Sequence, residues 1–112
     1  MNKYTKLSDF EINKAVFHKA KIKYKYFRFL PSGVITYNIK GKYQVFDPCN
    51  NPSDAMPIII ENGISMVRVN NTWSARQFNN HCIEINGDNY YRIAMETYLL
   101  MKDAENENNN NN

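Results

Sequence analysis

The sequence predicts an α+β fold: an antiparallel sheet of about five or six strands, an N-terminal helix, a short central helix and a long C-terminal helix. Two observations predict it. Apolar residues follow helical spacing near both ends of the chain. Between these ends, short runs alternate apolar with polar residues and are separated by Gly, Pro and Asn turns. With 112 residues, 43% of them hydrophobic, the chain suits a single domain, which we place at residues 1–104.

The N-terminal helix is predicted at about residues 9–20. Ser8 is followed three residues later by Glu11, which is the spacing of a capping box, where each side chain bonds to the other residue's backbone N–H. Leu7 precedes the cap and Ile12 follows it at the fourth helical position, so the two can form a hydrophobic staple.

Three strands are predicted after this helix, as an antiparallel meander. The stretch "KIKYKYFRFL" (21–30) alternates lysines with apolar residues until Phe27, where the phase slips and indicates a bulge or the end of the strand. A Pro-Ser-Gly turn leads to a second strand at 34–39, and Gly41 marks the turn to a third at 42–46.

The stretch "FDPCNNPSDAMPIIIENG" (46–63) reads as a rigid polar loop that leads into a short helix. Ser53 or Asp54 is predicted to cap that helix. Pro57 then falls in the first turn, where its missing N–H costs little. Gly63 supplies the left-handed residue that ends the helix.

The second half of the chain is predicted to hold further strands and the longest helix. Strands are expected at 64–69 and 72–78, on the two sides of an Asn-Asn turn, and a further short strand is expected at 82–85. Asp88 is the predicted cap of a helix at about 89–103. The low-complexity tail at 105–112 is expected to be disordered.

Charge is distributed unevenly along the chain. Residues 1–42 carry a net charge of +8 and residues 43–112 a net charge of −5. The basic half can attract phosphates or nucleic acid, and the two halves can complement each other within a monomer or in a homo-oligomer. The sequence has no apolar run of membrane-spanning length and no signal-peptide core. We therefore expect a cytoplasmic protein with no membrane partner, and its two cysteines as thiols.

Two segments resemble one protein family. The segments "LSDFEINKAV" and "FDPCNNPSDAMPIIIENGIS" are similar to the NinX-like proteins of tailed phages. That family also has a Trp before its final helix, matched here by Trp73 in "TWSA", and the C-terminal "RIAMETYLLMKDA" resembles its final apolar helix. Met56 stands where the family commonly has an aromatic residue, and "KIKYKYFRFL" is not recognisably shared. The resemblance implies a phage origin and an accessory role, and it implies no activity.

Motifs for catalysis, metal binding and cofactor binding are not evident in the sequence. Asp47, Cys49, Asp54, His81 and Cys82 are residue types that bind metals, but their spacing matches no zinc motif. Cys82 is better interpreted as a small core residue and His81 as a surface residue. Cys49 needs a base to act as a nucleophile, and neither histidine lies in a catalytic context. We therefore expect no catalytic residue, no cofactor and no enzymatic activity.

Nucleic-acid binding is an alternative that the basic strand raises. Cations that contact phosphates and exposed aromatic rings that stack on bases are typical of single-strand binders. Strict alternation favours the opposite arrangement, in which the aromatic residues line the core and the cations lie at its solvated edge. The cations of this alternative site are Lys21, Lys23, Lys25 and Arg28.

The function that we predict is binding without turnover, in which a phage protein counteracts a host defence by sequestering a nucleotide-like immune signal. Trp73 is expected to stack on the base and Arg76 to bind a phosphate. The polar loop supplies partners for the edges of the ligand, from Asp47, Asn50, Asn51 and Asp54. The alternatives are an inhibitor that binds a host defence protein and the single-stranded nucleic-acid binder described above.

Overall fold

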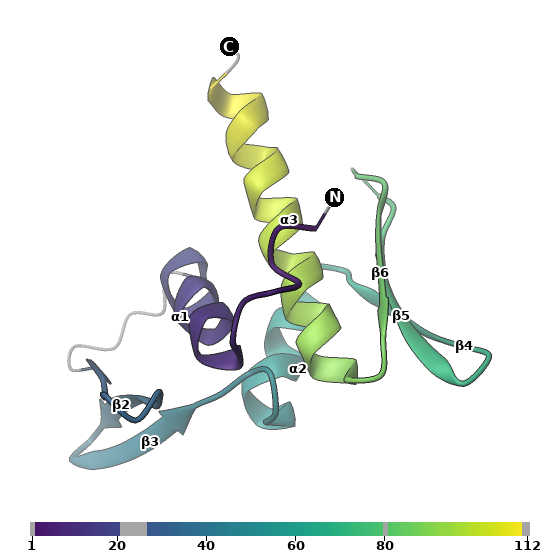
Figure 1. Ribbon diagram of the computed structural model, residues 1–112. Helices are drawn as coiled ribbons and strands as arrows, with labels where there is room; N and C mark the ends of the chain where they lie inside the picture. Colours follow the sequence, from purple (N-terminus) through teal and green to yellow (C-terminus); the bar gives the residue numbers. More distant parts are fainter. Residues whose placement is uncertain (1, 21–26, 80, 111–112) are drawn as a thin grey trace.

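The computed structural model describes residues 2–20, 27–79 and 81–110, and these form the predicted α+β fold (Figure 1). The elements in chain order are α1 (Asp9–Lys19), β1 (Phe27–Phe29), β2 (Ile35–Ile39), β3 (Lys42–Phe46), α2 (Pro52–Glu61), β4 (Ser65–Val69), β5 (Thr72–Gln77), β6 (Ile83–Gly87) and α3 (Tyr90–Asn110). Among these described residues, no helix is both long enough and apolar enough to cross a membrane.

The strands form two antiparallel sheets instead of the single sheet that was predicted. Strands β1-β2-β3 make the first sheet and β4-β5-β6 make the second, each with three strands. Helix α3 separates them: α1 and α2 pack against α3, and so do β5 and β6 of the second sheet (Figure 1). Alternation along the sequence identifies strands but does not identify their partners, so it could not distinguish one sheet from two.

Helix α1 has the predicted capping box and buries its apolar face. The hydroxyl of Ser8 accepts the N–H of Glu11 at 3.1 Å, and the carboxylate of Glu11 accepts the N–H of Ser8 at 3.3 Å. Ile12, Val16 and Phe17 are buried beneath the helix. The predicted bounds of this helix hold to within one residue.

The first sheet packs its inner face against α1. Ile35 on β2 pairs with Phe46 on β3, and both side chains are buried. The hairpin between these strands turns at Lys40 and Gly41, which both have positive φ (52° and 84°), as a two-residue type I′ turn requires. Asn38 accepts the Gly41 N–H at 2.9 Å and holds the turn. The strand predicted at 21–30 is described only from its last part, as β1.

Helix α2 begins earlier than predicted. Asn51 is its N-cap and accepts the N–H of Ser53 at 3.1 Å, so neither Ser53 nor Asp54 caps the helix. Pro57 is therefore the sixth residue of the helix and lies beyond the first turn. Pro57 has no N–H to donate to the Ser53 carbonyl. Both residues are exposed, so water can donate a hydrogen bond to that carbonyl instead. Gly63 has the predicted left-handed conformation, with φ +62°.

Helix α3 also differs from the prediction at both ends. Asn89 accepts the N–H of Arg92 at 3.1 Å and takes the capping role expected of Asp88. Asp88 instead accepts a hydrogen bond from the threonine hydroxyl at the start of β5. The helix runs to Asn110 and does not end near residue 103, so the boundary proposed for a disordered tail falls inside it.

Helix α3 forms the centre of the hydrophobic core. Its buried side chains face α1, α2 and the second sheet. Beside them, at the end of β6, Gly87 is required, because a Cβ at that position would lie 2.7 Å from the Ile93 Cγ2 atom. The buried apolar residues of α3 are Ile93, Ala94, Met95, Tyr98, Leu99 and Met101, and Glu96 and Thr97 are buried as well.

Candidate functional site

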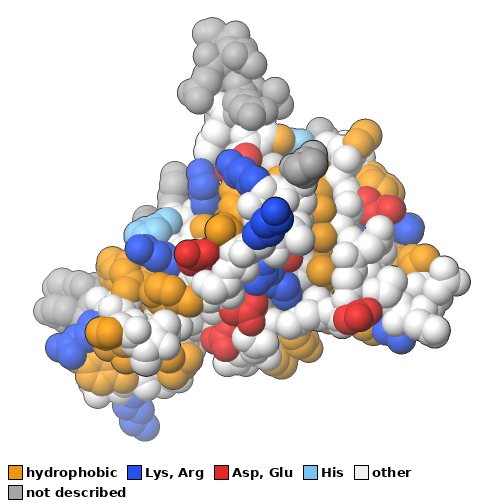
Figure 2. All heavy atoms as spheres, viewed as in Figure 1, with side chains coloured by type: hydrophobic (Ala, Val, Ile, Leu, Met, Phe, Trp, Pro, Cys, Tyr) orange, Lys and Arg blue, Asp and Glu red, His pale blue; other side chains and the backbone are white. Residues whose placement is uncertain are grey.

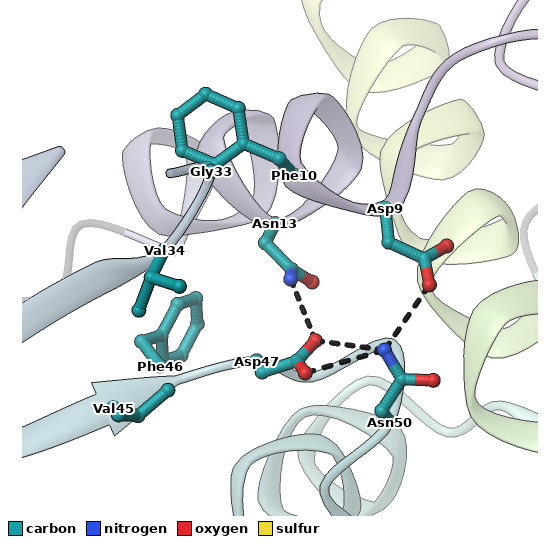
Figure 3. Close-up of a pocket in the computed structure, with 9 residues that line it drawn as sticks. All are labelled: Asp9, Phe10, Asn13, Gly33, Val34, Val45, Phe46, Asp47 and Asn50. Carbon is teal, nitrogen blue, oxygen red and sulfur yellow. Dashed lines mark hydrogen bonds between the residues drawn. The ribbon is translucent and has the colours of Figure 1, made fainter. Parts of the chain in front are cut away.

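The polar loop between β3 and α2 is bonded to α1. Asn13, only 5% exposed, donates to the carboxylate of Asp47 at 2.7 Å and accepts the N–H of Cys49 at 3.1 Å. Asn50 donates to Asp9 at 3.1 Å and to both carboxylate oxygens of Asp47 at 3.1 and 3.2 Å (Figure 3). The polar side chains of this loop therefore bond to one another and fix its shape.

The remaining polar residues of the loop hold the start of α2. The carboxylate of Asp54 accepts the N–H of Asp47 at 2.9 Å, and Asn51 caps the helix. Burial raises the pKa of Asp54, and the hydrogen bond from the Asp47 backbone only partly offsets that effect. Each of the four loop residues predicted to bind a ligand thus has a structural role in the loop.

The loop borders two cavities of different size. The smaller one, about 90 Å³, lies between α1 and the β2–β3 hairpin and is lined by Asp47 and Asn50 among others (Figure 3). It is much smaller than the roughly 300–1,000 Å³ of ordinary ligand pockets. The larger one, about 320 Å³, is lined by Tyr37 and Phe46 together with the carboxylates of Asp54 and Glu61. Its aromatic walls and acidic groups suit a nucleobase or a cation better than a phosphate.

A third cavity, of about 420 Å³, lies between β6 and α3. Cys82 lines it and is exposed, so the interpretation of Cys82 as a core residue was wrong. The core cysteine is Cys49, which is fully buried. Burial raises the pKa of the Cys49 thiol, with a further contribution from the nearby Asp9 carboxylate. The thiol is therefore protonated at neutral pH, and a thiol is a much weaker nucleophile than a thiolate.

Arg92 at the start of α3 joins the N-terminal segment to the core. Its guanidinium pairs with Asp9 at 2.7 Å and with Glu96 at 2.8 Å, and it donates to the carbonyls of Tyr4 and Leu7 at 2.9 and 2.8 Å. Burial alone would raise the pKa of Asp9, but the hydrogen bonds that Asp9 accepts from Arg92 and Asn50, together with the charge of Arg92, outweigh burial and lower it. Sequence reasoning missed this residue, although Arg and Glu four positions apart in an apolar helix were a usable signal.

Trp73 and Arg76 lie on β5, which packs against α3 as part of the second sheet, whereas the polar loop lies beside α1 and α2 (Figure 1). They are three residues apart on β5 and therefore point to opposite faces of the second sheet. Trp73 packs edge-on against Tyr90, with ring centroids 4.9 Å apart, and lies under the guanidinium of Arg68 at 5.0 Å. Arg76 pairs with Glu84 at 2.9 Å. Neither of the two cavities that border the loop is lined by Trp73 or Arg76.

Of the predicted nucleic-acid residues, Lys21, Lys23 and Lys25 lie outside the described residues, whereas Arg28 is in β1. The register pairs Arg28 with Thr36 on β2, Thr36 with Val45 on β3, and Asn38 on β2 with Tyr43 on β3. These residues alternate with the buried Ile35 and Phe46, so they lie on the opposite face of the sheet. We call this surface the outer face; it consists of Arg28, Thr36, Asn38, Tyr43 and Val45.

The outer face carries exposed apolar groups beside a cation. Tyr43 is 59% exposed and Val45 52% exposed, and the guanidinium of Arg28 lies 6.0 Å from the centre of the Tyr43 ring. Sequence reasoning missed Tyr43, although its place in the alternating strand "KYQVF", one residue out of phase with Phe46, was a sufficient signal.

The surroundings of the outer face are basic. The sequence from residue 12 to residue 46 contains eight Lys and Arg residues and no Asp or Glu. Figure 2 shows hydrophobic and basic side chains over the β1–β3 end of the molecule, while acidic side chains lie over its middle and over the second sheet. This end of the molecule therefore attracts anions.

A protein-family model described as "Bacteriophage P22, NinX" matches residues 3–102. The match runs from the N-terminal segment that Arg92 holds to the middle of α3, and so it includes both sheets. No curated protein matches the chain.

Proposed function

The chain belongs to the NinX family of bacteriophage proteins, and on this premise we propose that it binds, without chemical turnover, a partner that carries nucleobases and phosphates. We assign this binding to the infected cell, where it counteracts a host defence. Two kinds of partner carry these groups. One is a free nucleotide-like immune signal, which the protein would sequester, and the other is a nucleic acid.

The single observation that carries the proposal is the pair formed by Arg28 and Tyr43 on the outer face. An exposed aromatic ring offers a stacking surface to a base. A guanidinium beside it offers donors to a phosphate. Both groups lie on a sheet, which holds them more rigidly than a loop does.

The polar loop supports binding over catalysis. Asp47 and Asn50 use their side chains on each other and on α1, and the Cys49 thiol is buried and protonated. A nucleophile or general base needs an accessible atom within reach of a substrate. The roles of these loop residues in the fold therefore favour a structural function over a catalytic one.

A free nucleotide has its own candidate place in the cavity of about 320 Å³ beside α2. Phe46 and Tyr37 give this cavity an aromatic lining that suits a base, and Asp54 offers an acceptor to an exocyclic amino group. Glu61 adds a second carboxylate to this cavity, so the phosphates of such a ligand must lie outside it.

The proposal is tested by incubating the purified protein with cyclic dinucleotides, cyclic trinucleotides, ADP-ribose derivatives and short oligonucleotides. We expect at least one of these compounds to raise the melting temperature, because a ligand of the native state stabilises it by mass action. Heat denaturation should then release the compound unmodified. Asp54→Asn tests the cavity and Tyr43→Ala tests the outer face.

Two results would contradict the proposal in different ways. A compound returned cleaved would show turnover, and Asp47, Cys49 and Asp54 would be the first residues to substitute. A melting temperature unmoved by every compound would exclude the nucleotide chemistry, and the partner would then be sought among host defence proteins by crosslinking in infected cells.

A further inference from the structure

We propose that the outer face of the first sheet binds single-stranded nucleic acid, with Tyr43 stacking on a base and Arg28 contacting a phosphate. Lys40, in the hairpin turn of the same sheet, supplies a further phosphate contact. This inference rests on the proposed function and names its partner as a nucleic-acid strand in place of a free nucleotide.

The geometry of the sheet places the recognition groups in two adjacent rows. Arg28, Thr36 and Val45 lie side by side across the three strands, and Asn38 lies opposite Tyr43 in the next row. Cross-strand neighbours on one face lie about 5 Å apart. A five-residue strand such as β3 is roughly 16 Å long, so the surface offers room for a few nucleotides.

Tyr43 is better placed for stacking than the Trp that the sequence suggested. Both rings have an arginine beside them, Arg28 for Tyr43 and Arg68 for Trp73. The Trp73 ring, however, packs edge-on against Tyr90 and is only partly exposed. Tyr43 is 59% exposed, and a base needs a ring face that is open to solvent.

The cations beside Tyr43 are available for an anionic partner. In the described part of the chain, the ion pairs use Lys3, Arg76, His81, Arg92 and Lys102, and none uses Arg28 or Lys40. A cation without a nearby carboxylate keeps its full attraction for phosphate. The absence of acidic residues between positions 12 and 46 extends that attraction over the whole sheet.

The open shape of the surface favours a strand over a free nucleotide. A small ligand gains most of its affinity from enclosure, and the described cavity that reaches Val45 has a volume of only about 90 Å³. A strand instead combines several weak contacts along an open surface. A duplex hides its base faces, whereas unpaired bases present them to aromatic side chains. An acidic protein would satisfy the cations but would leave the Tyr43 ring without a partner.

The test measures binding of the full chain to fluorescent oligonucleotides of about twelve residues, as single-stranded DNA, single-stranded RNA and duplex, over a range of salt concentrations. We expect single strands to bind more tightly than duplex. Tyr43→Ala should weaken binding roughly 5- to 150-fold through lost stacking, while Tyr43→Phe, which keeps the ring, should not. Arg28→Gln should weaken binding and reduce the salt slope by about 0.7, the value for one phosphate contact with a single strand.

The second sheet supplies matched controls. Phe78→Ala removes a ring that is 59% exposed, like that of Tyr43, and Arg68→Gln removes an exposed arginine that also lies over an aromatic ring. Both should leave oligonucleotide affinity unchanged. Single-strand binding lost equally in all four variants, or unchanged in Tyr43→Ala and Arg28→Gln, overturns the inference.

Two further results separate this inference from the proposed function. If cyclic nucleotides are bound and returned intact while oligonucleotides fail to bind at about 50 mM salt, the inference fails and the proposed function stands. If polyglutamate of similar length competes as well as single-stranded DNA and Tyr43→Ala has no effect, the surface binds an acidic protein and the inference is again wrong.

Discussion

Arg92 connects three parts of the molecule: α1, α3 and the N-terminal segment. Its guanidinium bonds to Asp9 on α1, to Glu96 one turn along its own helix, and to three carbonyls of the N-terminal segment. The side chains of Arg92 and Glu96 are only 13% and 7% exposed. An ion pair that is withdrawn from water depends on every one of its bonds, because an unpaired buried charge is costly.

Arg92→Ala is therefore expected to lower the free energy of unfolding by about 3–5 kcal/mol, since it strands the buried Glu96 carboxylate. Urea denaturation of the purified variant measures the loss. Arg92→Lys should recover little of it, because an ammonium group cannot make the fork of bonds that a guanidinium makes.

The matched control for that substitution is Arg76→Ala. Arg76 also pairs with a glutamate, at 2.9 Å, but the two side chains are 31% and 43% exposed. Its loss should cost only about 0–1 kcal/mol. Equal effects of the two substitutions would mean that burial does not decide the strength of these pairs.

At this scale the sequence predicted the local roles of residues better than their long-range ones. The Ser8–Glu11 box was predictable because both partners lie within one helical turn. The partners of Arg92 other than Glu96 lie more than eighty residues away in the chain, beyond the reach of any spacing rule. Trp73 and Arg76 were placed in one pocket although their separation on a strand already put them on opposite faces.

The start of α2 shows how an element's boundary depends on a cap. The sequence "NNPSD" offers several capping residues in a row, and helical spacing does not choose among them. The structure uses Asn51, which also bonds to the Ser53 hydroxyl at 2.9 Å. That choice allows Pro52 to occupy the first position of the helix, where proline is favoured.

Asn51→Ala should therefore cost about 1 kcal/mol of stability through loss of the cap. Ser53→Ala should cost clearly less, because the Ser53 N–H that the cap bonds is retained. Thermal or urea unfolding of both variants measures the difference, and Asn51→Asp, which keeps the capping oxygen, should lie close to the unsubstituted protein. If Ser53→Ala proved the more damaging, the helix would begin where the sequence first placed it.

Strands were predicted well and their assembly was not. Six strands were expected at most, and six are described, in two sheets of three. The first sheet ends at Phe46 because the loop and α2 then carry the chain to α3. The alternating pattern shows which residues of a strand lie on each face, but it does not show which strands are neighbours. It therefore could not predict that the sheet ends after β3.

The N-terminal segment, residues 2–7, is bonded to α3. Tyr4 is 8% exposed, and its hydroxyl bonds to Asp103. Asn2 bonds to Glu96, and the carbonyls of this segment accept the bonds of Arg92. Residues 2–7 thus lie along α3 and cover part of it (Figure 1).

Deletion of residues 2–7 should lower the free energy of unfolding by about 3 kcal/mol or more, since it removes a buried tyrosine and the acceptors of Arg92. Deletion of residues 105–112 is the control. It removes the pairs of Glu105 with Lys102 and His81, at 3.3 and 3.9 Å, in which the Glu105 side chain is 42% exposed. Such pairs are worth about 0–1 kcal/mol. Urea denaturation compares the two, and a larger loss from the C-terminal deletion would contradict this view of the fold.

The contact between Tyr4 and Asp103 spans 99 positions of the chain, so Tyr4 is made well before its partner. Translation adds about 5–20 residues per second, so roughly 5–20 seconds pass between the synthesis of Tyr4 and that of Asp103. During that time α1 and the first sheet have no α3 to pack against. The nascent chain cannot finish folding before α3 is made, and until then its apolar surfaces are open to the chaperones and proteases of the infected cell.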